Sequence, residues 1–258
     1  STYSIFNKDF PYIDEINNGF CIYKQLFPKN KEVKIIVYLE EDVFNAWDPA
    51  YQLDFQPVNY LPSSKSGLAE CDWISVGLHW FLGADHTFYA TENIPNYIKS
   101  RLDSMYISPM IFHQLGKYVI FEGGDIDLPT SFLDFIIREA KPYFFAQHIL
   151  SNTSEDRILG NSSEDIIYFK QYEKAFWKEE VLANDLLYSK DQNLWKEKYI
   201  KAGDYLVTTD GTEMPSRFGV WTGLQILNAY LQNNDVSLKE VLFEKDYKKI
   251  INQSNYQP

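Results

Sequence analysis

PSRFGVWTGLQILNAYL, residues Pro215–Leu231, is the stretch around which the chain is organised. Its opening, Pro215-Ser216, favours a helix start, because a serine can cap the free backbone N–H groups of the first turn. Apolar residues then recur at the spacing of a helix with one buried face. These residues are Val220, Leu224, Leu227, Tyr230 and Leu231. We therefore predict a helix over this stretch.

Two glycines, Gly219 and Gly223, lie one turn apart inside the predicted helix. A glycine within a helix costs about 1 kcal/mol relative to alanine, so the pair requires a structural reason. The reason we favour is another backbone that packs closely against this face of the helix. Both glycines are accordingly predicted to be packing residues.

A second line of side chains on the same helix consists of Arg217, Trp221 and Gln225, each one turn after the last. This spacing aligns a cation, an indole and an amide. An arginine in the first turn of an apolar helix either pairs with a buried carboxylate, which we favour, or binds an anionic group. The three residues are candidate contacts for a partner or a cleft.

Composition excludes several classes of function. The 258 residues are 45% hydrophobic and 23% charged, with a net charge of −12. This charge argues against nucleic-acid binding and against electrostatic attachment to anionic lipid. No segment approaches the roughly 20 apolar residues of a membrane-spanning helix. The aromatic content of 17% favours a wide aromatic core over a carbohydrate- or peptide-binding face.

Two cysteines, Cys21 and Cys71, permit one disulfide, although two buried free thiols are the favoured interpretation. Two cysteines cannot build a structural zinc site without histidines. Because the sequence begins at Ser1 and not at a methionine, we expect that an export signal or a tag has been removed.

The order of the predicted elements indicates an α+β fold that is predominantly helical, with a small N-terminal sheet followed by a helical half. A broken helical segment within residues 5–27 precedes strands at Lys34–Leu39, Tyr51–Phe55 and Asp72–Phe81. Helices are predicted at Pro95–Leu102, Pro109–Lys117, Pro129–Leu150, Ser163–Leu187, Asp191–Lys201, Leu238–Phe243 and Asp246–Ile251. We predict a single domain over residues 1–258, with its sheet in residues 1–90 and its helical part in residues 91–258.

Common catalytic motifs are missing from the sequence, including GxGxxG, GxSxG, CxxC and HExxH. His79 and His86 lie seven residues apart, and Asp85 could add a carboxylate ligand, but a metal site needs a third well-aimed ligand. We favour instead a turn that begins at Gly83, in which Asp85 or His86 bonds to the backbone and Tyr89 covers the turn. Asp85, His86 and Tyr89 are further candidate contacts for a partner or a cleft. No cofactor or metal is predicted.

Several segments together resemble the GldB family of gliding-motility lipoproteins of Bacteroidota. They are DWISVGLHWFLGADHTFY, IPNYI, SRFGVWTGLQILNAYL and the closing NQSNYQP, in this order. The resemblance runs from about Lys34 to the C-terminus. Family proteins of this kind carry a lipid on an N-terminal cysteine, which in this protein would precede Ser1.

The family is similar in turn to the HExxH zinc peptidases of the gluzincin type. That resemblance implies a metal-binding helix within Pro129–Leu150. The positions of the first histidine, the catalytic glutamate and the second histidine are taken here by Glu139, Ala140 and Tyr143. Such a set holds no zinc, and Pro142 is expected to kink the helix. The resemblance implies a peptidase scaffold without its metal, in which the helix of Pro215–Leu231 forms one wall of the inherited cleft.

The resemblance further implies a non-catalytic lipoprotein of the cell envelope that contacts proteins of the gliding-motility and type 9 secretion machinery. Two alternatives remain open from the residues. One is a metal-dependent hydrolase that uses an unorthodox site such as His79, Asp85 and His86. The other is a module that binds glycan or peptidoglycan, which the aromatic content suggests.

Overall fold

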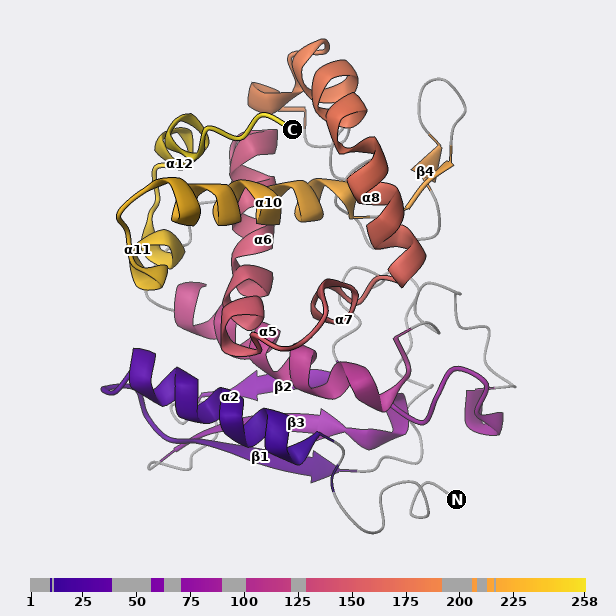
Figure 1. Cartoon of the computed structure of the whole chain (residues 1–258). Coiled ribbons are helices and arrows are strands. Elements are labelled where there is room, and N and C mark those ends of the chain that lie inside the picture. Colours follow the sequence, from indigo (N-terminus) through magenta and orange to yellow (C-terminus); the bar gives the residue numbers. More distant parts are fainter. Residues whose placement is uncertain are drawn as a thin grey trace. The chain divides into compact units, whose positions relative to one another are not determined.

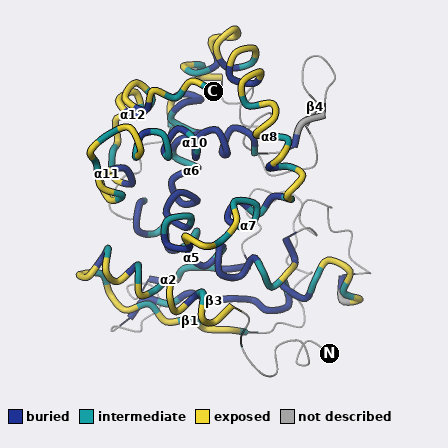
Figure 2. The backbone as a smooth tube through the Cα atoms, in the orientation of Figure 1, coloured by how far each residue is buried: buried dark blue, intermediate teal, exposed yellow. Residues whose placement is uncertain are grey.

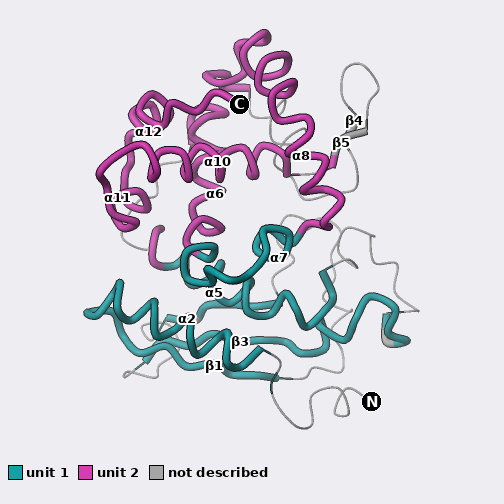
Figure 3. The backbone as a smooth tube through the Cα atoms, in the orientation of Figure 1, with its two compact units in different colours: residues 1–118, 146–160 teal, residues 119–145, 161–258 magenta. Residues whose placement is uncertain are grey.

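The computed structural model describes residues 10, 12–38, 57–62, 71–89, 101–121, 129–191, 206–207, 213–215 and 217–258 (Figure 1). The chain folds into two compact units (Figure 3). Unit 1 comprises residues 1–118 and 146–160, and unit 2 comprises residues 119–145 and 161–258. The fold is α+β and predominantly helical, as predicted. The predicted single domain, with its parts meeting at residue 90, stays a prediction.

Unit 1 holds a three-stranded sheet in the order β1-β3-β2. The strands are β1 (Val33–Tyr38), β2 (Val58–Leu61) and β3 (Asp72–Gly77). β1 runs parallel to β3, and β2 runs antiparallel to it. The predicted strands at 34–39 and 72–81 are confirmed as β1 and β3. β3 nevertheless ends at Gly77, where a 3-10 helix, Leu78–Trp80, follows.

β2 was not predicted, because prolines flank its four residues and made the segment look like a loop. The weak strand predicted at 51–55 lies outside the described residues. In β3, the alternation of apolar side chains is confirmed, since Ile74 and Val76 are fully buried whereas Trp73 and Ser75 are half-buried.

Helix α2 (Ile13–Leu26) corrects the prediction of a broken helical segment, because it runs without interruption through Gly19. This glycine is required by close packing. A Cβ atom at Gly19 would lie 2.3 Å from the ring of Phe112 in α5 (Ile107–Phe121). α5 also contacts the sheet, because Tyr118 stacks on Tyr60 of β2 with ring centroids 3.8 Å apart.

The remaining described elements of unit 1 are short. They are the 3-10 helices Thr87–Tyr89 and Ser104–Tyr106 and helix α7 (Glu155–Leu159). The helices predicted at 95–102 and 191–201 fall on residues that for the most part lie outside the described ranges.

Unit 2 is built from helices that follow the predicted ranges closely. α6 spans Phe132–Ile149, of which residues 132–145 belong to this unit, and α11 spans Leu238–Phe243. α8 (Ser163–Ala175) begins with a capping box between Ser162 and Asp165. The predicted helix to residue 187 changes at Phe176 into a π-helix, Phe176–Leu182, and a 3-10 helix, Leu186–Tyr188, follows. A short hairpin, β4 (Leu206–Val207) and β5 (Glu213–Met214), precedes α10.

The central helix of the prediction is α10 (Phe218–Asn233), whose buried residues place it in the core of unit 2 (Figure 2). Phe218 at its start stacks on Phe169 and Phe176, with ring centroids 4.9 and 4.3 Å apart. The aromatic residues of α8, the π-helix and α10 therefore form a common core, as the composition indicated.

The C-terminal segment closes over α8 and α10. α12 (Tyr247–Ser254) lies beside the end of α10, where the Asn233 Nδ2 donates to the Ser254 carbonyl at 2.6 Å. The Tyr256 ring packs edge-on against Trp177 at 5.0 Å. Its hydroxyl donates to Glu173 Oε1 at 2.7 Å. The closing segment NQSNYQP, one of the segments on which the family resemblance rests, thus has a structural role in this unit.

Tyr256→Phe is expected to reduce the free energy of unfolding by about 1 kcal/mol, since the hydrogen bond to Glu173 is lost while the ring contact remains. Urea unfolding of the full chain measures the change. The matched control is Tyr172→Phe, which removes a hydroxyl from an exposed side chain of α8. Equal stability of the two variants would show that the hydroxyl of Tyr256 contributes nothing.

Candidate functional site

The predicted cleft elements, α6 and α10, pack directly against each other within unit 2. A Cβ atom at Gly223 would lie 2.2 Å from the carbonyl oxygen of Ile136 and 3.0 Å from the Ala140 Cβ. The close backbone approach predicted for Gly223 is therefore present, and its partner is the α6 backbone. Gly219 is buried in the same helix.

This contact includes Ala140, one of the three positions that the resemblance to zinc peptidases would assign to a metal-binding helix. Ala140 has an exposed fraction of 0% and Tyr143 of 8%. Pro142 lies inside the helix, which nevertheless continues to Ile149. Glu139, the third position, is half-buried. Packing therefore fills the space around Ala140, where the resemblance predicted a cleft.

Arg217 lies outside the first turn that was predicted for it. It occupies the N-cap position of α10 in the left-handed conformation, with φ 71°, and makes no side-chain cap. The helix therefore begins at Phe218, and Ser216, the predicted cap, lies outside the described residues. The Arg217 guanidinium lies 5.4 Å from the centre of the Tyr143 ring, a cation–π contact. Arg217 is half-buried, so it keeps an accessible face.

Trp221 and Gln225, which were predicted to align with Arg217, lie in different environments. Trp221 has an exposed fraction of 1% and packs on Phe169 and Phe218 at 5.6 Å from each ring centre. The prediction that Trp221 contacts a partner is therefore wrong, because its indole is buried in the aromatic core. Gln225 is half-buried.

The predicted turn at Gly83 is confirmed in unit 1. Gly83 has φ +96°, and its carbonyl accepts the His86 N–H at 3.0 Å. Tyr89 is 2% exposed; its hydroxyl donates to the His79 carbonyl at 2.5 Å and accepts from the Leu82 N–H at 3.2 Å. Tyr89 is thus a core residue that holds the turn, and its burial corrects the prediction that it contacts a partner. Asp85 is exposed and His86 half-exposed.

The alternative metal ligands have contrasting environments. His79 is buried, and burial lowers the pKa of its imidazole to about 4. Within the described ranges, no three His, Cys, Asp or Glu side chains gather in a way that could hold a metal ion. Cys21 and Cys71 are free thiols, and Cys71 is buried whereas Cys21 is exposed.

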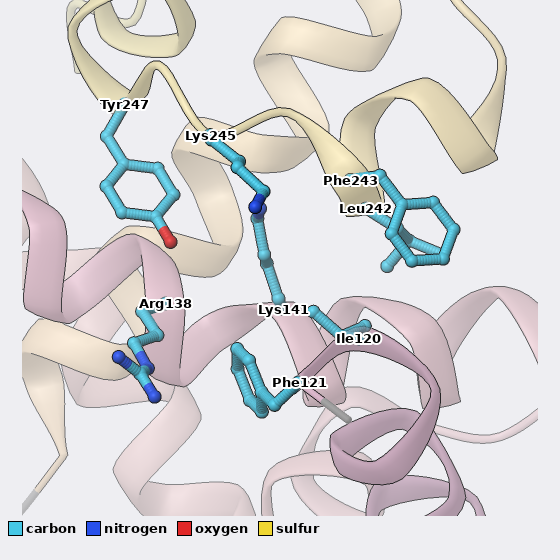
Figure 4. A pocket seen from close by; sticks show the side chains of 8 residues that line it. All are labelled: Ile120, Phe121, Arg138, Lys141, Leu242, Phe243, Lys245 and Tyr247. Carbon is cyan, nitrogen blue, oxygen red and sulfur yellow. The ribbon is translucent and has the colours of Figure 1, made fainter. Parts of the chain in front are cut away.

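The sequence reading overlooked two basic residues of α6, Arg138 and Lys141. They lie three positions apart and therefore share a face of the helix. Together with Lys245, they line a pocket of unit 2 (Figure 4). The signal in the sequence is a pair of cations one turn apart, on either side of Glu139, in a stretch that is largely apolar.

Comparison with known protein families gives a match over nearly the whole chain. The sequence model of a family described as "Gliding motility protein GldB" matches residues 2–258. Searches of curated proteins and of solved structures find no match. In the part of the chain that the structure describes, no helix has the length and apolar character needed to cross a membrane.

Proposed function

The chain belongs to the GldB family of gliding-motility lipoproteins of the cell envelope, and from this premise we propose that it is a non-catalytic component of the gliding-motility and type 9 secretion apparatus of Bacteroidota. It acts through contacts with other envelope proteins at the outer membrane. In this proposal the fold is a pseudo-peptidase of the gluzincin type.

The packing of α10 on α6 carries the proposal. A catalytic cleft requires space at the metal-binding helix for a metal, a water molecule and a substrate. Here Ala140 is fully buried, and the backbone of Gly223 lies against it and against Ile136. Tyr143 lies under the Arg217 guanidinium. These contacts support a structural use of the helix.

A second observation supports protein contacts. Unit 2 exposes large apolar side chains along α8, the π-helix and the following 3-10 helix. Their exposed fractions are 63% for Ile167, 53% for Leu182 and 52% for Tyr188. Large apolar side chains that are exposed to solvent are candidate contacts for a partner protein. We call this set the α8 surface and propose that it contacts an envelope partner.

Zinc analysis tests the non-catalytic part of the proposal. We expect the purified full chain to contain far less than one zinc ion per molecule and to cleave no peptide substrate beyond background. The control is the same preparation after incubation with excess zinc and dialysis. One zinc ion per chain that disappears in His86→Ala, together with chelator-sensitive peptide turnover, would contradict the proposal and support the metal-dependent hydrolase.

Substitutions on the α8 surface test the protein-contact part. We expect Ile167→Asn combined with Leu182→Asn to reduce gliding and to reduce cross-linking to envelope proteins. The unfolding free energy should change by no more than about 0.5 kcal/mol, since both side chains are exposed. Lys170→Asn, at another exposed position of α8, is the matched control. Normal gliding and unchanged cross-links in the double variant would exclude this surface.

A further inference from the structure

The sheet of unit 1 ends at β1, the strand Val33–Tyr38 (Figure 1). In the part of the chain that the structure describes, its one neighbouring strand is β3, to which it runs parallel. The opposite edge strand, β2, has four residues and lies between Pro57 and Pro62. Short strands and prolines protect a sheet edge against further pairing. β1 is longer and contains no proline, so it is the edge to which another strand can add.

Alternate residues of β1 direct their backbone groups to this outer edge. The Asp72 N–H of β3 donates to the Glu32 carbonyl at 2.9 Å. Because successive residues of a strand point their N–H and C=O groups to opposite sides, the residues of β1 that bond to β3 have even numbers. The odd-numbered residues therefore present their N–H and C=O groups to the outer edge. They are Val33, Ile35 and Val37.

The side chains of β1 leave this edge apolar. Ile36 and Val37, which point to opposite faces of the sheet, are 39% and 40% exposed. Lys34 is the one charged residue of the strand, and its Nζ lies 5.7 Å from the centre of the Trp73 ring in β3. A lysine on an edge strand usually keeps other strands away, but this lysine lies over the neighbouring strand of its own sheet. The edge is therefore suited to another strand that is rich in β-branched residues.

The charges around β1 favour a second copy of the same strand in the antiparallel direction. Lys29 and Lys31 precede β1, together with Glu32, whereas residues 40–42, which follow it in the sequence, are all acidic. Antiparallel pairing of two copies brings the lysine-containing start of each strand toward the acidic end of the other. Parallel pairing would bring the two acidic ends together, which is unfavourable. The sequence around β1 is thus complementary to itself in one direction.

We propose that two copies of this chain pair through β1 and join their sheets into one continuous sheet. Ile35 lies opposite Ile35 of the partner subunit, and Val33 lies opposite Val37 of the partner subunit, each as a hydrogen-bonded pair. This antiparallel register pairs all three outward-facing residues of each strand. The contact has two-fold symmetry and is therefore closed, so association ends at the dimer.

A contact made by one strand from each copy is small, so a weak dimer with a Kd in the micromolar range is expected. The proposal goes beyond the proposed function, because it concerns unit 1 and a second copy of this chain. The α8 surface belongs to unit 2 and is proposed to contact other proteins. Each proposal can therefore fail without the other.

Sedimentation equilibrium of the full chain, from low micromolar to submillimolar concentrations, tests the proposal. We expect a reversible equilibrium between monomer and dimer. Ile35→Pro removes an N–H that β3 does not use, a change that edge strands tolerate. Two hydrogen bonds of the dimer are lost, so dimerisation should weaken by about thirtyfold. The matched control is Ile35→Ala, which also shortens the side chain but keeps the N–H, and it should weaken dimerisation by about fivefold or less.

Circular dichroism and thermal unfolding check that both variants are folded. A stronger loss of the dimer in Ile35→Pro than in Ile35→Ala supports pairing through the outer edge of β1. Equal dimerisation of the two variants would overturn it. So would an unmodified chain that stays monomeric at every concentration, in which case the edge is left for a strand of another protein.

Disulfide cross-linking tests the direction and the register without a change in the backbone of β1. In the proposed register Lys34 lies opposite Ile36 of the partner subunit as a non-hydrogen-bonded pair. The Cα atoms of such a pair are about 4.5 Å apart, which is within the range that a disulfide spans. Both side chains are exposed, so Lys34→Cys and Ile36→Cys should leave the fold intact. Each is combined with Cys21→Ser, because Cys21 is an exposed free thiol.

The two cysteine variants are mixed, oxidised and separated by mass. We expect disulfides between Lys34→Cys and Ile36→Cys to form in preference to disulfides between two copies of either variant. Parallel pairing places identical residues opposite each other, and so gives the reverse preference. That reverse preference, or the absence of any cross-link, would contradict the antiparallel dimer even if Ile35→Pro did not fold.

Discussion

Gly223→Ala is expected to destabilise the protein by about 1–3 kcal/mol, and Gly223→Leu by more. In an open helix, replacement of glycine by alanine stabilises by up to about 1 kcal/mol. At Gly223 the added Cβ would lie 2.2 Å from the carbonyl oxygen of Ile136 and 2.7 Å from its carbon. These are backbone atoms of α6, so no side-chain rotation can relieve the overlap, and the two helices must separate.

Urea unfolding of the full chain measures the effect of both substitutions. Gln232→Leu is the control, because it adds a larger apolar side chain at an exposed position of the same helix. Its unfolding free energy should stay within about 0.5 kcal/mol of the unmodified chain. Gly223→Ala that is equal to or more stable than the unmodified chain would refute the close approach of α10 to α6.

The second large effect is expected at Arg157, which joins several segments of unit 1. Its guanidinium pairs with Glu15 of α2 at 2.9 Å and donates to the Met105 carbonyl at 2.8 and 3.1 Å. It also lies 4.8 Å from the centre of the Tyr12 ring. Glu15 accepts further hydrogen bonds from Ser108 and Thr153. A single arginine of α7 thus connects this helix to α2 and to the 3-10 helix Ser104–Tyr106.

Arg157→Met is expected to lower the free energy of unfolding by about 2–3 kcal/mol. The side chains of Arg157 and Glu15 are 16% and 23% exposed, so the loss should be smaller than the roughly 3–5 kcal/mol of a fully buried pair. Much of the loss comes from Glu15, which is left without its counter-charge. Arg157→Lys should recover only part of it, because an ammonium cannot bind both Glu15 oxygens in parallel.

Glu15→Gln combined with Arg157→Met completes a double-mutant cycle for this pair. We expect the two single effects to be non-additive by about 1 kcal/mol or more. Strict additivity would show that the pair contributes no coupling. Lys249→Met provides the comparison, because it breaks the ion pair between Glu244 and the exposed Lys249 of α12. It should lower the free energy of unfolding by about 0–1 kcal/mol.

The same glutamate gives the stability a pH dependence of known sign. Burial raises the pKa of Glu15, but hydrogen bonds from Ser108, Thr153 and Arg157 and the charge of Arg157 outweigh burial and hold its pKa below the ordinary value of 4.5. Its contribution is therefore fully present above pH 4.5 and is lost as the pH falls through the lower folded value. Unfolding measured between pH 3 and 7 should show a shallower loss for Glu15→Gln, and identical profiles would contradict this role.

The sequence predicted the helices of unit 2 well because their signals are local. The apolar spacing of α10 and the capping serines of α8 and α11 depend only on neighbouring residues. The predictions were less accurate where tertiary packing decides. α2 continues through Gly19, because that position lies against Phe112, and β2 forms by pairing with β3. Neither partner can be identified from local spacing.

In the candidate site, too, local spacing predicted some features and tertiary packing decided the others. The pattern of α10 indicated that Gly223 must meet another backbone, but only the fold identifies Ile136 and Ala140 as the contact. The aligned spacing of Arg217, Trp221 and Gln225 suggested one common surface. Packing separates them, since the Trp221 indole enters the aromatic core while the Arg217 guanidinium, at the N-cap position of α10, lies over the Tyr143 ring.

By itself, the sequence determined the family, the α+β class and the need for close packing at Gly223, because composition, motifs and helical period are properties of the chain alone. The tertiary structure decided which surfaces remain for binding. Packing of α10 against α6 fills the place of the predicted cleft. Arg138 and Lys141 of α6 meet Lys245, which lies about 100 residues further along the chain. Side chains so distant in sequence are brought together only by the packing of whole helices.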